Sequence, residues 1–265
     1  MEKKKVLAIS GSMRNPSFTE KIMDLCIEGM GEGFEVQKFY PHRMKIGPCL
    51  GCWACWKKTS PGACVQKDDF VQILNAYKEA DYLLLAAPLY FFGLPATVKN
   101  VIDRLFVILE PGQYESPRGG TVHPKRYDRH PKAVLISSCG FPELGNFDLL
   151  RQHFMKICHE LDWEWAGEVL VPAAGSANVP GLFDAKYDLI RDAGAELVAG
   201  PIRKATTAKM AEVMMPDSDY RKMCTANFRG GLVGNLTRIL IGIKAMVRLA
   251  MKGRQDSHPI KRAAV

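Results

Sequence analysis

The sequence has no excess of glycine or proline, no charge-dominated block, no internal repeat and no low-complexity segment. These absences exclude a fibrous or disordered protein, and 265 residues are enough for one large core or two small ones. The first residues, MEKKKVLAIS, lack the long apolar stretch and the small-residue cleavage site of a signal peptide. We therefore expect a cytoplasmic protein whose eight cysteines serve as thiols, metal ligands or redox groups rather than as disulfides.

Acidic residues are scarce in the last quarter of the chain. Residues 200–265 contain 13 lysines and arginines but only 4 aspartates and glutamates, whereas the residues before them contain 23 and 24. A nucleic-acid-binding domain would carry its basic excess across its main body. Because the body is close to neutral, we expect no nucleic-acid partner.

Short apolar runs alternate with amphipathic segments about five times along the first 200 residues. The run Tyr82–Ala87 is apolar on both faces, as strands inside a parallel sheet are. This alternation predicts an α/β protein with a doubly wound, five-stranded parallel sheet. The predicted strands are Val6–Ser10, Phe34–Phe39, Tyr82–Ala87, Ala133–Ser138 and Glu168–Val171, and the predicted helices are Phe18–Met30, Asp68–Ala80, Ala96–Leu109, Asn146–Leu161 and Ala185–Val198.

The remaining residues predict a second part of the chain. We expect a sheet domain over residues 1–200, with a cysteine-rich insertion at 47–67, and a basic helical extension over 201–265. In this extension Lys244, Arg248 and Lys252 share one face of a predicted helix, which carries too many charges to span a bilayer. The apolar side of that helix is expected to pack on the domain or on a second subunit, and peripheral membrane contact is the alternative.

Polar residues follow the first predicted strand. The loop GSMRNPSFT carries hydroxyl groups at Ser12, Ser17 and Thr19 and a guanidinium at Arg14, with a helix amino terminus behind it. Hydroxyl donors, backbone amides and a helix dipole suit a phosphate group. The loop has neither the GxGxxG pattern nor the GxxxxGK[ST] pattern, which disfavours a dinucleotide fold and a P-loop NTPase. The alternative is a polar loop in which Ser17 or Thr19 only caps the helix.

Two further loops follow predicted strands at the same edge of the sheet. In PLYFFGLP the three consecutive aromatics, Tyr90 to Phe92, point in different directions, so the core alone does not explain them. A flat heteroaromatic ligand would use them as an apolar wall. In SSCGFPE, Gly140 lets backbone amides approach the edge of a ligand.

The cysteine-rich insertion contains Cys49, Cys52 and Cys55 in a CxxCxxC run, followed by Cys64. Four thiolates within sixteen positions are able to ligate a [4Fe–4S] cluster or a zinc ion. The alternative is a metal-free loop that Trp53 and Trp56 bury. Farther along, Asp103 and Arg104 are expected to form structural ion pairs at a helix surface.

In their order and spacing, the segments GSMRNPSFT, APLYFFGLPATVKNVIDR and SSCGFPE resemble the NAD(P)H-dependent FMN reductases. The resemblance covers about residues 5–200 and implies a flavodoxin-like fold, bound FMN, NADH or NADPH as co-substrate, and a homo-oligomer. It also implies electron transfer to a quinone, a small oxidant or a redox partner, without an obligate catalytic acid or base. The implied FMN-binding residues are Ser10, Ser12, Arg14, Ser17, Phe18, Thr19, Pro88, Leu89, Tyr90, Phe91, Phe92, Gly93, Ser138, Cys139 and Gly140.

The cysteine motif is also similar to that of the iron-sulfur flavoproteins. This similarity implies a [4Fe–4S] cluster on Cys49, Cys52, Cys55 and Cys64, although the gap before Cys64 is longer here. Two other functions remain open at this point. One is a flavodoxin-type electron carrier without its own small-molecule substrate, and the other is a redox or iron sensor.

Overall fold

The computed structural model describes residues 3–58 and 61–256, and these contain a five-stranded parallel sheet of order β2-β1-β3-β6-β7. A separate two-stranded antiparallel sheet pairs β4 with β5. The strands are β1 (Lys4–Ser10), β2 (Phe34–Phe39), β3 (Tyr82–Ala86), β4 (Tyr114–Glu115), β5 (Thr121–Val122), β6 (Lys132–Ser138) and β7 (Glu164–Val171). The strand order confirms the predicted flavodoxin-like fold, in which ligands bind beyond the carboxyl ends of the strands.

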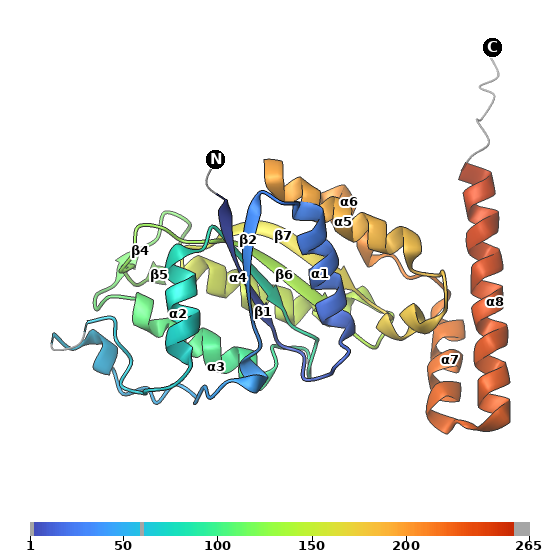
Figure 1. Ribbon diagram of the computed structural model, residues 1–265, viewed down its shortest axis with the longest axis horizontal. Helices are drawn as coiled ribbons and strands as arrows, with labels where there is room; N and C mark the ends of the chain where they lie inside the picture. The colour runs from blue at the N-terminus through green and yellow to red at the C-terminus, as the bar shows by residue number, and fades with distance from the viewer. Residues whose placement is uncertain (1–2, 59–60, 257–265) are drawn as a thin grey trace, which may run out of the picture.

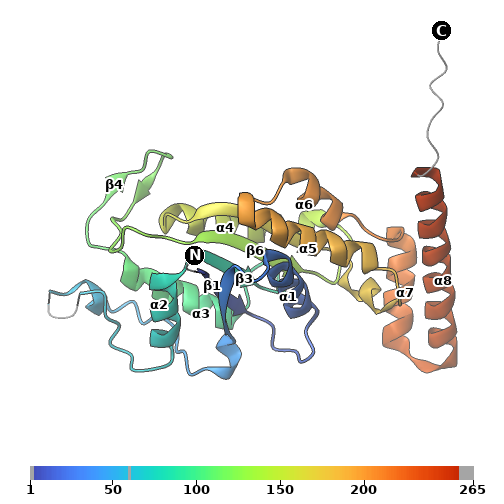
Figure 2. The same ribbon diagram turned by 45° about the horizontal axis from the view of Figure 1, so that its top comes forward.

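Helices cover both faces of the five-stranded sheet. Helices α1 and α5 pack on one face, and α2, α3 and α4 pack on the other. The helices are α1 (Phe18–Met30), α2 (Phe70–Glu79), α3 (Ala96–Arg104), α4 (Asp148–Glu160), α5 (Asp184–Ala199), α6 (Lys204–Ala211), α7 (Asp217–Arg229) and α8 (Gly231–Asp256). In both views the α7–α8 hairpin stands at the end of the molecule away from β4 and β5 (Figures 1 and 2).

The alternating side chains of the sheet build one core on each face. Leu7 and Ile9 of β1 face the core with α2 to α4, whereas Val6 and Ala8 face the core with α1 and α5. Because β1, β3 and β6 are covered on both sides, their residues from Leu83 to Ala86 and from Ala133 to Ile136 are buried almost completely. Continuous apolar runs are the sequence pattern of such central parallel strands.

The predicted elements differ from the structure mainly at their ends. The helix expected over Ala96–Leu109 ends at Arg104 and continues as a 3-10 turn, η3 (Leu105–Ile108). That turn buries Leu105, Val107 and Ile108 together, which one side of an α-helix would not do for such closely spaced residues. The predicted strand residues Glu168–Val171 lie within β7, which begins at Glu164. The short strands β4 and β5 have no counterpart in the prediction.

The C-terminal extension is helical, as the sequence predicts. Asp219 of α7 forms ion pairs with Lys244 (3.0 Å) and Arg248 (3.1 Å), which lie on one face of α8 as expected. The side chain of Lys252, the third residue of that predicted face, lies outside the described residues. Across residues 3–58 and 61–256, no helix combines the length and the hydropathy that crossing a membrane requires.

A buried lysine joins α5 to α6 and makes stability depend on pH. The ammonium of Lys186 donates hydrogen bonds to the carbonyl oxygens of Met210 (2.6 Å) and Glu212. Burial lowers the pKa of Lys186 from 10.5 to about 8. Between these two pH values Lys186 is protonated in the unfolded chain but not in the folded one. The contribution of Lys186 to the free energy of unfolding therefore rises with pH.

We therefore expect the free energy of unfolding of the wild type, relative to Lys186→Met, to rise between pH 8 and 10.5. The total rise should be on the order of 3 kcal/mol. Urea denaturation of both proteins at pH 7, 8, 9 and 10 measures it. A difference that stays flat or falls with pH contradicts the lowered pKa.

Candidate functional site

Three loops that are distant in sequence meet at the carboxyl edge of the sheet. The amide of Gly11, after β1, donates to the carbonyl of Ala86 at the end of β3 (2.7 Å), and the amide of Leu89 donates to the carbonyl of Ser138 at the end of β6 (3.0 Å). The hydroxyl groups of Thr19 and Ser138 lie 2.7 Å apart and are hydrogen-bonded across 119 positions of the chain. The structure thus brings the three predicted loops into one candidate site.

The first loop presents hydrogen-bond donors in front of helix α1. Ser17 caps the helix by accepting a hydrogen bond from the Glu20 amide (3.2 Å), so its predicted capping role is confirmed. The Arg14 side chain is exposed. The buried hydroxyl of Ser10 has no hydrogen-bond partner among the described atoms, which leaves a polar group available to a ligand. Hydroxyl groups, a guanidinium and a helix amino terminus together fit a phosphate.

Gly11 lets this loop approach helix α3. A Cβ atom at Gly11 would lie 2.4 Å from Cγ2 of Val98 and 3.2 Å from the carbonyl oxygen of Ala86. The first distance is shorter than real Cβ contacts and the second is tighter than most of them, so a larger residue would push the loop away from α3 and the sheet edge. Phe18, by contrast, turns from the loop toward α5 and packs edge-on against Phe183, with ring centroids 5.8 Å apart.

The second loop exposes its aromatic residues in a tight turn. Tyr90 and Gly93 exchange two backbone hydrogen bonds of 3.2 and 3.0 Å, and the two residues between them, Phe91 and Phe92, have positive φ angles of 45° and 63°. Positive φ is sterically unfavourable for aromatic residues. Phe91 is fully exposed, and Tyr90 and Phe92 are 43% and 44% exposed. Such strain and apolar exposure are typical of a ligand-binding turn rather than of a packed core.

The third loop is held by a residue of the C-terminal extension. The Cys139 thiol is buried, which raises its pKa, and it donates to the carbonyl of Phe141 (3.1 Å). The hydroxyl of Tyr220 in α7 donates to the carbonyl of Gly140 (2.7 Å) and accepts from the amide of Gly175 (3.3 Å). Tyr220 is not predictable from the sequence, because no local pattern links a helix residue to a loop 80 positions away.

Replacing Tyr220 by phenylalanine should loosen this loop. The variant loses both hydrogen bonds of the hydroxyl, so we expect it to lower the free energy of unfolding by about 1–2 kcal/mol. Amide hydrogen exchange in residues 139–142 should become faster. Tyr187→Phe, at a partly buried position of α5, is the control and should change neither quantity. Unchanged exchange in Tyr220→Phe would show that Tyr220 does not hold the loop.

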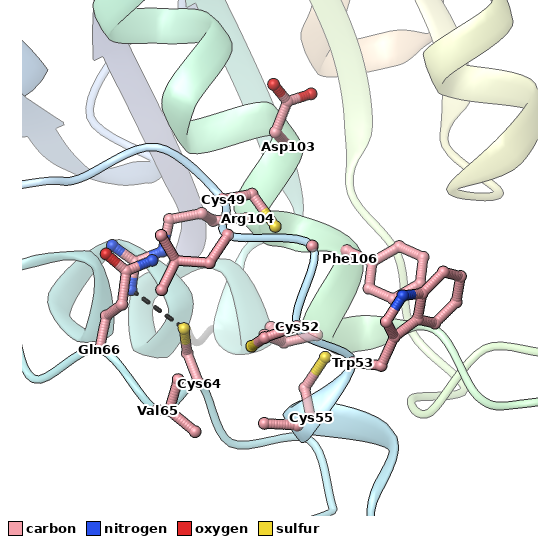
Figure 3. Close-up of a pocket in the computed structure, with 14 residues that line it drawn as sticks. Cys49, Cys52, Trp53, Cys55, Cys64, Val65, Gln66, Asp103, Arg104 and Phe106 are labelled. Carbon is pink, nitrogen blue, oxygen red and sulfur yellow. Dashed lines mark hydrogen bonds between the residues drawn. The ribbon is translucent and has the colours of Figure 1, made fainter.

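The four cysteines of the insertion line one cavity of about 350 Å³. Figure 3 shows Cys64 beside Arg104 on one side of this cavity and Phe106 beside Trp53 on the other, with Cys52 and Cys55 between them. Burial raises the pKa of the Cys55 thiol, and the proximity of the three other thiols raises it further. The spacing of the motif therefore predicts correctly which cysteines gather.

Aromatic rings hold the cysteine loop against the end of α3. Trp56 stacks on Phe106 with ring centroids 4.7 Å apart, and Trp53 contacts both rings edge-on at 4.9 and 5.3 Å. Trp53 has a positive φ of 57° and is more than half exposed. The tryptophans thus pack the loop onto η3, as the metal-free alternative expects, while the cavity beside them stays open.

Arg104 is a buried cation beside the cysteines. It ion-pairs with Asp68 and donates hydrogen bonds to Sγ of Cys64 (3.3 Å) and to the carbonyl of Gly47 (3.4 Å). Burial acts to raise the pKa of Asp68, but the hydrogen bonds from Arg104 and from the amides of Gly47 and Phe70, with the positive charge of Arg104, together outweigh it and lower that pKa. The expected surface ion pair is therefore correct for Asp103, which pairs with Lys99, and wrong for Arg104, which is 2% exposed. The closing of the cysteine loop over α3 buries it.

The cysteine cavity does not have the geometry of a site for a single metal ion. Among the described side chains, no group of three or more His, Cys, Asp or Glu residues is placed to hold one. Tetrahedral zinc with bonds of about 2.3 Å would draw its sulfur ligands to within about 4 Å of one another. An iron-sulfur cluster keeps its cysteine sulfurs farther apart, because inorganic sulfide and several irons lie between them.

The cavity and the three loops lie at opposite ends of α3. Pro95, at the helix amino terminus, belongs to the second loop, whereas Arg104, at its carboxyl end, lines the cysteine cavity. A nine-residue helix separates its ends by about 13 Å. The chain therefore has two distinct candidate sites.

Comparisons with known proteins identify the family of the chain. The model of the family described as NADPH-dependent FMN reductase matches residues 4–141. An iron-sulfur flavoprotein of Archaeoglobus fulgidus is 32% identical over 119 residues, which cover 44% of this chain and 53% of that protein. The chain spans about half the length of the curated relatives that it matches.

Solved structures show the same fold at low sequence identity. An FMN-dependent NADH-azoreductase from Bacillus anthracis, solved with FMN, has a TM-score of 0.55 and 15% identity, covering 74% of this chain and 99% of that one. An NAD(P)H:quinone oxidoreductase from Methanothermobacter marburgensis has a TM-score of 0.53 and 18% identity, with the same coverage.

Proposed function

The chain belongs to the NADPH-dependent FMN reductase family, and on that premise we propose that it is an FMN-dependent NAD(P)H oxidoreductase. It takes a hydride from NADH or NADPH and passes electrons to a quinone, a small oxidant or a redox partner. The observation that carries the proposal is the convergence of the three loops, joined by the hydrogen bond between Thr19 and Ser138. A phosphate-binding loop and an exposed aromatic turn on one sheet edge match the two ends of FMN.

Each loop has a distinct task in this proposal. Ser10, Ser12, Arg14, Ser17 and Thr19 bind the phosphate end, with Phe18 supporting the start of α1 from behind. Pro88, Leu89, Tyr90, Phe91, Phe92 and Gly93 form the apolar wall of the flavin ring, and Ser138, Cys139 and Gly140 close the opposite edge. When bound, FMN supplies a ring that accepts a hydride, and the protein contributes position, electrostatics and the exclusion of water. We assign no side chain as catalytic acid or base.

Titration of the flavin-free protein with FMN tests this site. We expect tight binding by the wild type and about tenfold weaker binding by Thr19→Val, which loses the hydrogen bond to Ser138 beside the phosphate loop. Thr237→Val on α8 is the matched control and should bind like the wild type. No flavin bound after reconstitution would overturn the proposal. Slow oxidation of NADH and NADPH by a flavin-loaded protein would leave a flavodoxin-type carrier instead.

A second candidate function involves the cysteine cavity. We propose that Cys49, Cys52, Cys55 and Cys64 ligate a [4Fe–4S] cluster that carries single electrons between the flavin and an external partner. Two observations support this: the cysteines line one cavity, and relatives at 32% to 36% identity are named iron-sulfur flavoproteins. Arg104 would offset part of the negative charge of four thiolates through its hydrogen bond to Cys64.

The nicotinamide, the electron acceptor, a homo-oligomer and a cytoplasmic location complete this proposal. The family match supports the nicotinamide and the electron acceptor. Light scattering on the flavin-loaded protein measures the oligomeric state. A monomer at micromolar concentration would remove the oligomer from the proposal and leave the redox function untouched.

A further inference from the structure

The side of α8 that faces away from the molecule is apolar. We call it the outer face of α8, and each of its large side chains is more than half exposed: Leu232, Val233, Leu236, Ile239, Leu240, Ile243, Val247 and Met251. Phe228, at the end of α7, is 89% exposed as well. A contiguous row of exposed apolar side chains along one helix is typical of a surface that binds another molecule. The sequence predicts that this side packs on the domain or on a second subunit, with peripheral membrane contact as the alternative. No described residue of the chain covers it.

The charges around the outer face have one sign. Residues 220–255 contain eight lysines and arginines and no aspartate or glutamate. Asp219 just before them is already paired with Lys244 and Arg248. The basic residues with described side chains are all exposed, and they are Arg221, Lys222, Arg229, Arg238, Lys244 and Arg248. Arg221 forms an ion pair with Glu143 (3.4 Å), whereas no ion pair is found for Lys222, Arg229 and Arg238 among the described residues. An occupant of this surface must therefore combine apolar material with negative charge.

A second copy of this hairpin would supply apolar material but not negative charge. It would bury the apolar side chains but would bring one basic surface against another, without acidic partners in residues 220–255. An anionic lipid surface supplies both an apolar layer and negative charge. Helices with an apolar side and basic residues on their other sides lie in the plane of such an interface.

We propose that the outer face of α8 binds the surface of an anionic phospholipid bilayer, with the helix lying in the interface. The opposite side of α8 is fixed to the protein: Ala245 is buried, and Gly242 lies against Val179, where a Cβ atom would come within 3.3 Å. The hairpin therefore presents its apolar side chains without unfolding.

The same hairpin holds the third loop of the candidate flavin site through Tyr220 and Gly140. A bilayer bound to α8 would keep that loop near the membrane and favour electron acceptors dissolved in lipid. This consequence for the acceptor rests on the proposed function, whereas lipid binding itself does not.

Flotation with lipid vesicles tests the proposal on the full-length protein. We expect the wild type to float with vesicles of phosphatidylglycerol and phosphatidylcholine and to stay in solution with phosphatidylcholine alone. The double substitution Leu240→Ser and Ile243→Ser should lower the partition coefficient more than tenfold. Arg238→Gln should lower it about fivefold. Leu149→Ser and Val71→Ser together remove two equally exposed apolar side chains from α4 and α2 and should have no effect.

The assay needs neither flavin nor nicotinamide, so its failure is distinguishable from failure of the proposed function. A wild type that stays in solution with anionic vesicles at low salt overturns the proposal. A wild type that ignores vesicles but forms a dimer, which Leu240→Ser and Ile243→Ser dissociate, assigns the outer face to a second copy instead. Partition into phosphatidylcholine equal to that into the anionic vesicles contradicts the role of charge.

Discussion

Replacing Cys52 by serine is expected to remove the iron from the protein while leaving its flavin in place. Serine does not replace a thiolate ligand of an iron-sulfur cluster well, so iron should fall from about four atoms per chain to less than one. FMN should be retained because the cysteine cavity lies about 13 Å from the flavin loops, at the far end of α3. Iron analysis, flavin analysis and visible absorption of protein purified without oxygen measure both quantities.

Cys224→Ser is the matched control for this experiment. Cys224 is partly buried on α7 and lies outside the cavity, so its replacement should change the iron content little. Two results would contradict the cluster. A wild type that contains flavin but no iron would leave an FMN reductase with unligated cysteines. Retention of full iron content by Cys52→Ser would place any cluster elsewhere.

Of the substitutions proposed for this protein, Gly194→Ala is expected to lower the free energy of unfolding most. Helices α1 and α5 cross so closely that a Cβ atom at Gly194 would lie 1.9 Å from the carbonyl oxygen of Cys26, and one at Gly29 would lie 1.9 Å from that of Arg191. Backbone atoms cannot rotate aside as a side chain can, so the helices must separate. We expect the free energy of unfolding to fall by about 3 kcal/mol.

The same substitution should weaken FMN binding. Helix α1 carries Ser17 and Thr19 at its amino terminus, so a displaced helix moves the proposed phosphate loop. Gly200→Ala, just after the same helix α5, is the control, because a Cβ atom there meets nothing within 4 Å. Urea denaturation and FMN titration compare the two variants. Equal stability of both would show that the helices adjust to the added methyl group.

Local patterns predicted much of the fold because the signals that end an element lie beside it. The predicted bounds of α1, Phe18–Met30, agree with the structure, since Ser17 caps its start and Gly31 follows its end with a φ of 77°. Strand β2 also agrees over Phe34–Phe39. In contrast, the end of α3 at Arg104 depends on how Leu105 to Ile108 pack, and packing leaves no local signal.

The candidate site also has features that local sequence predicts and features that it does not. The three loops were predictable, because the carboxyl ends of parallel strands meet at one edge of a sheet. The contacts that hold them were not, because Tyr220 reaches Gly140 across 80 positions and Thr19 reaches Ser138 across 119. The sequence predicts Arg104 as a surface residue of a helix, whereas in the structure the cysteine loop covers it.

The sequence by itself determined the alternation of strands and helices, the position of the three loops and the grouping of the four cysteines. Each follows from periodicity or spacing over a few residues. The tertiary structure decided that the cysteine cavity and the flavin loops lie at opposite ends of α3, that Arg104 is buried, and that the apolar side of α8 is exposed. These features depend on which surfaces meet when distant segments pack. Because α8 is apolar on two sides, its sequence does not specify which of them the rest of the protein covers.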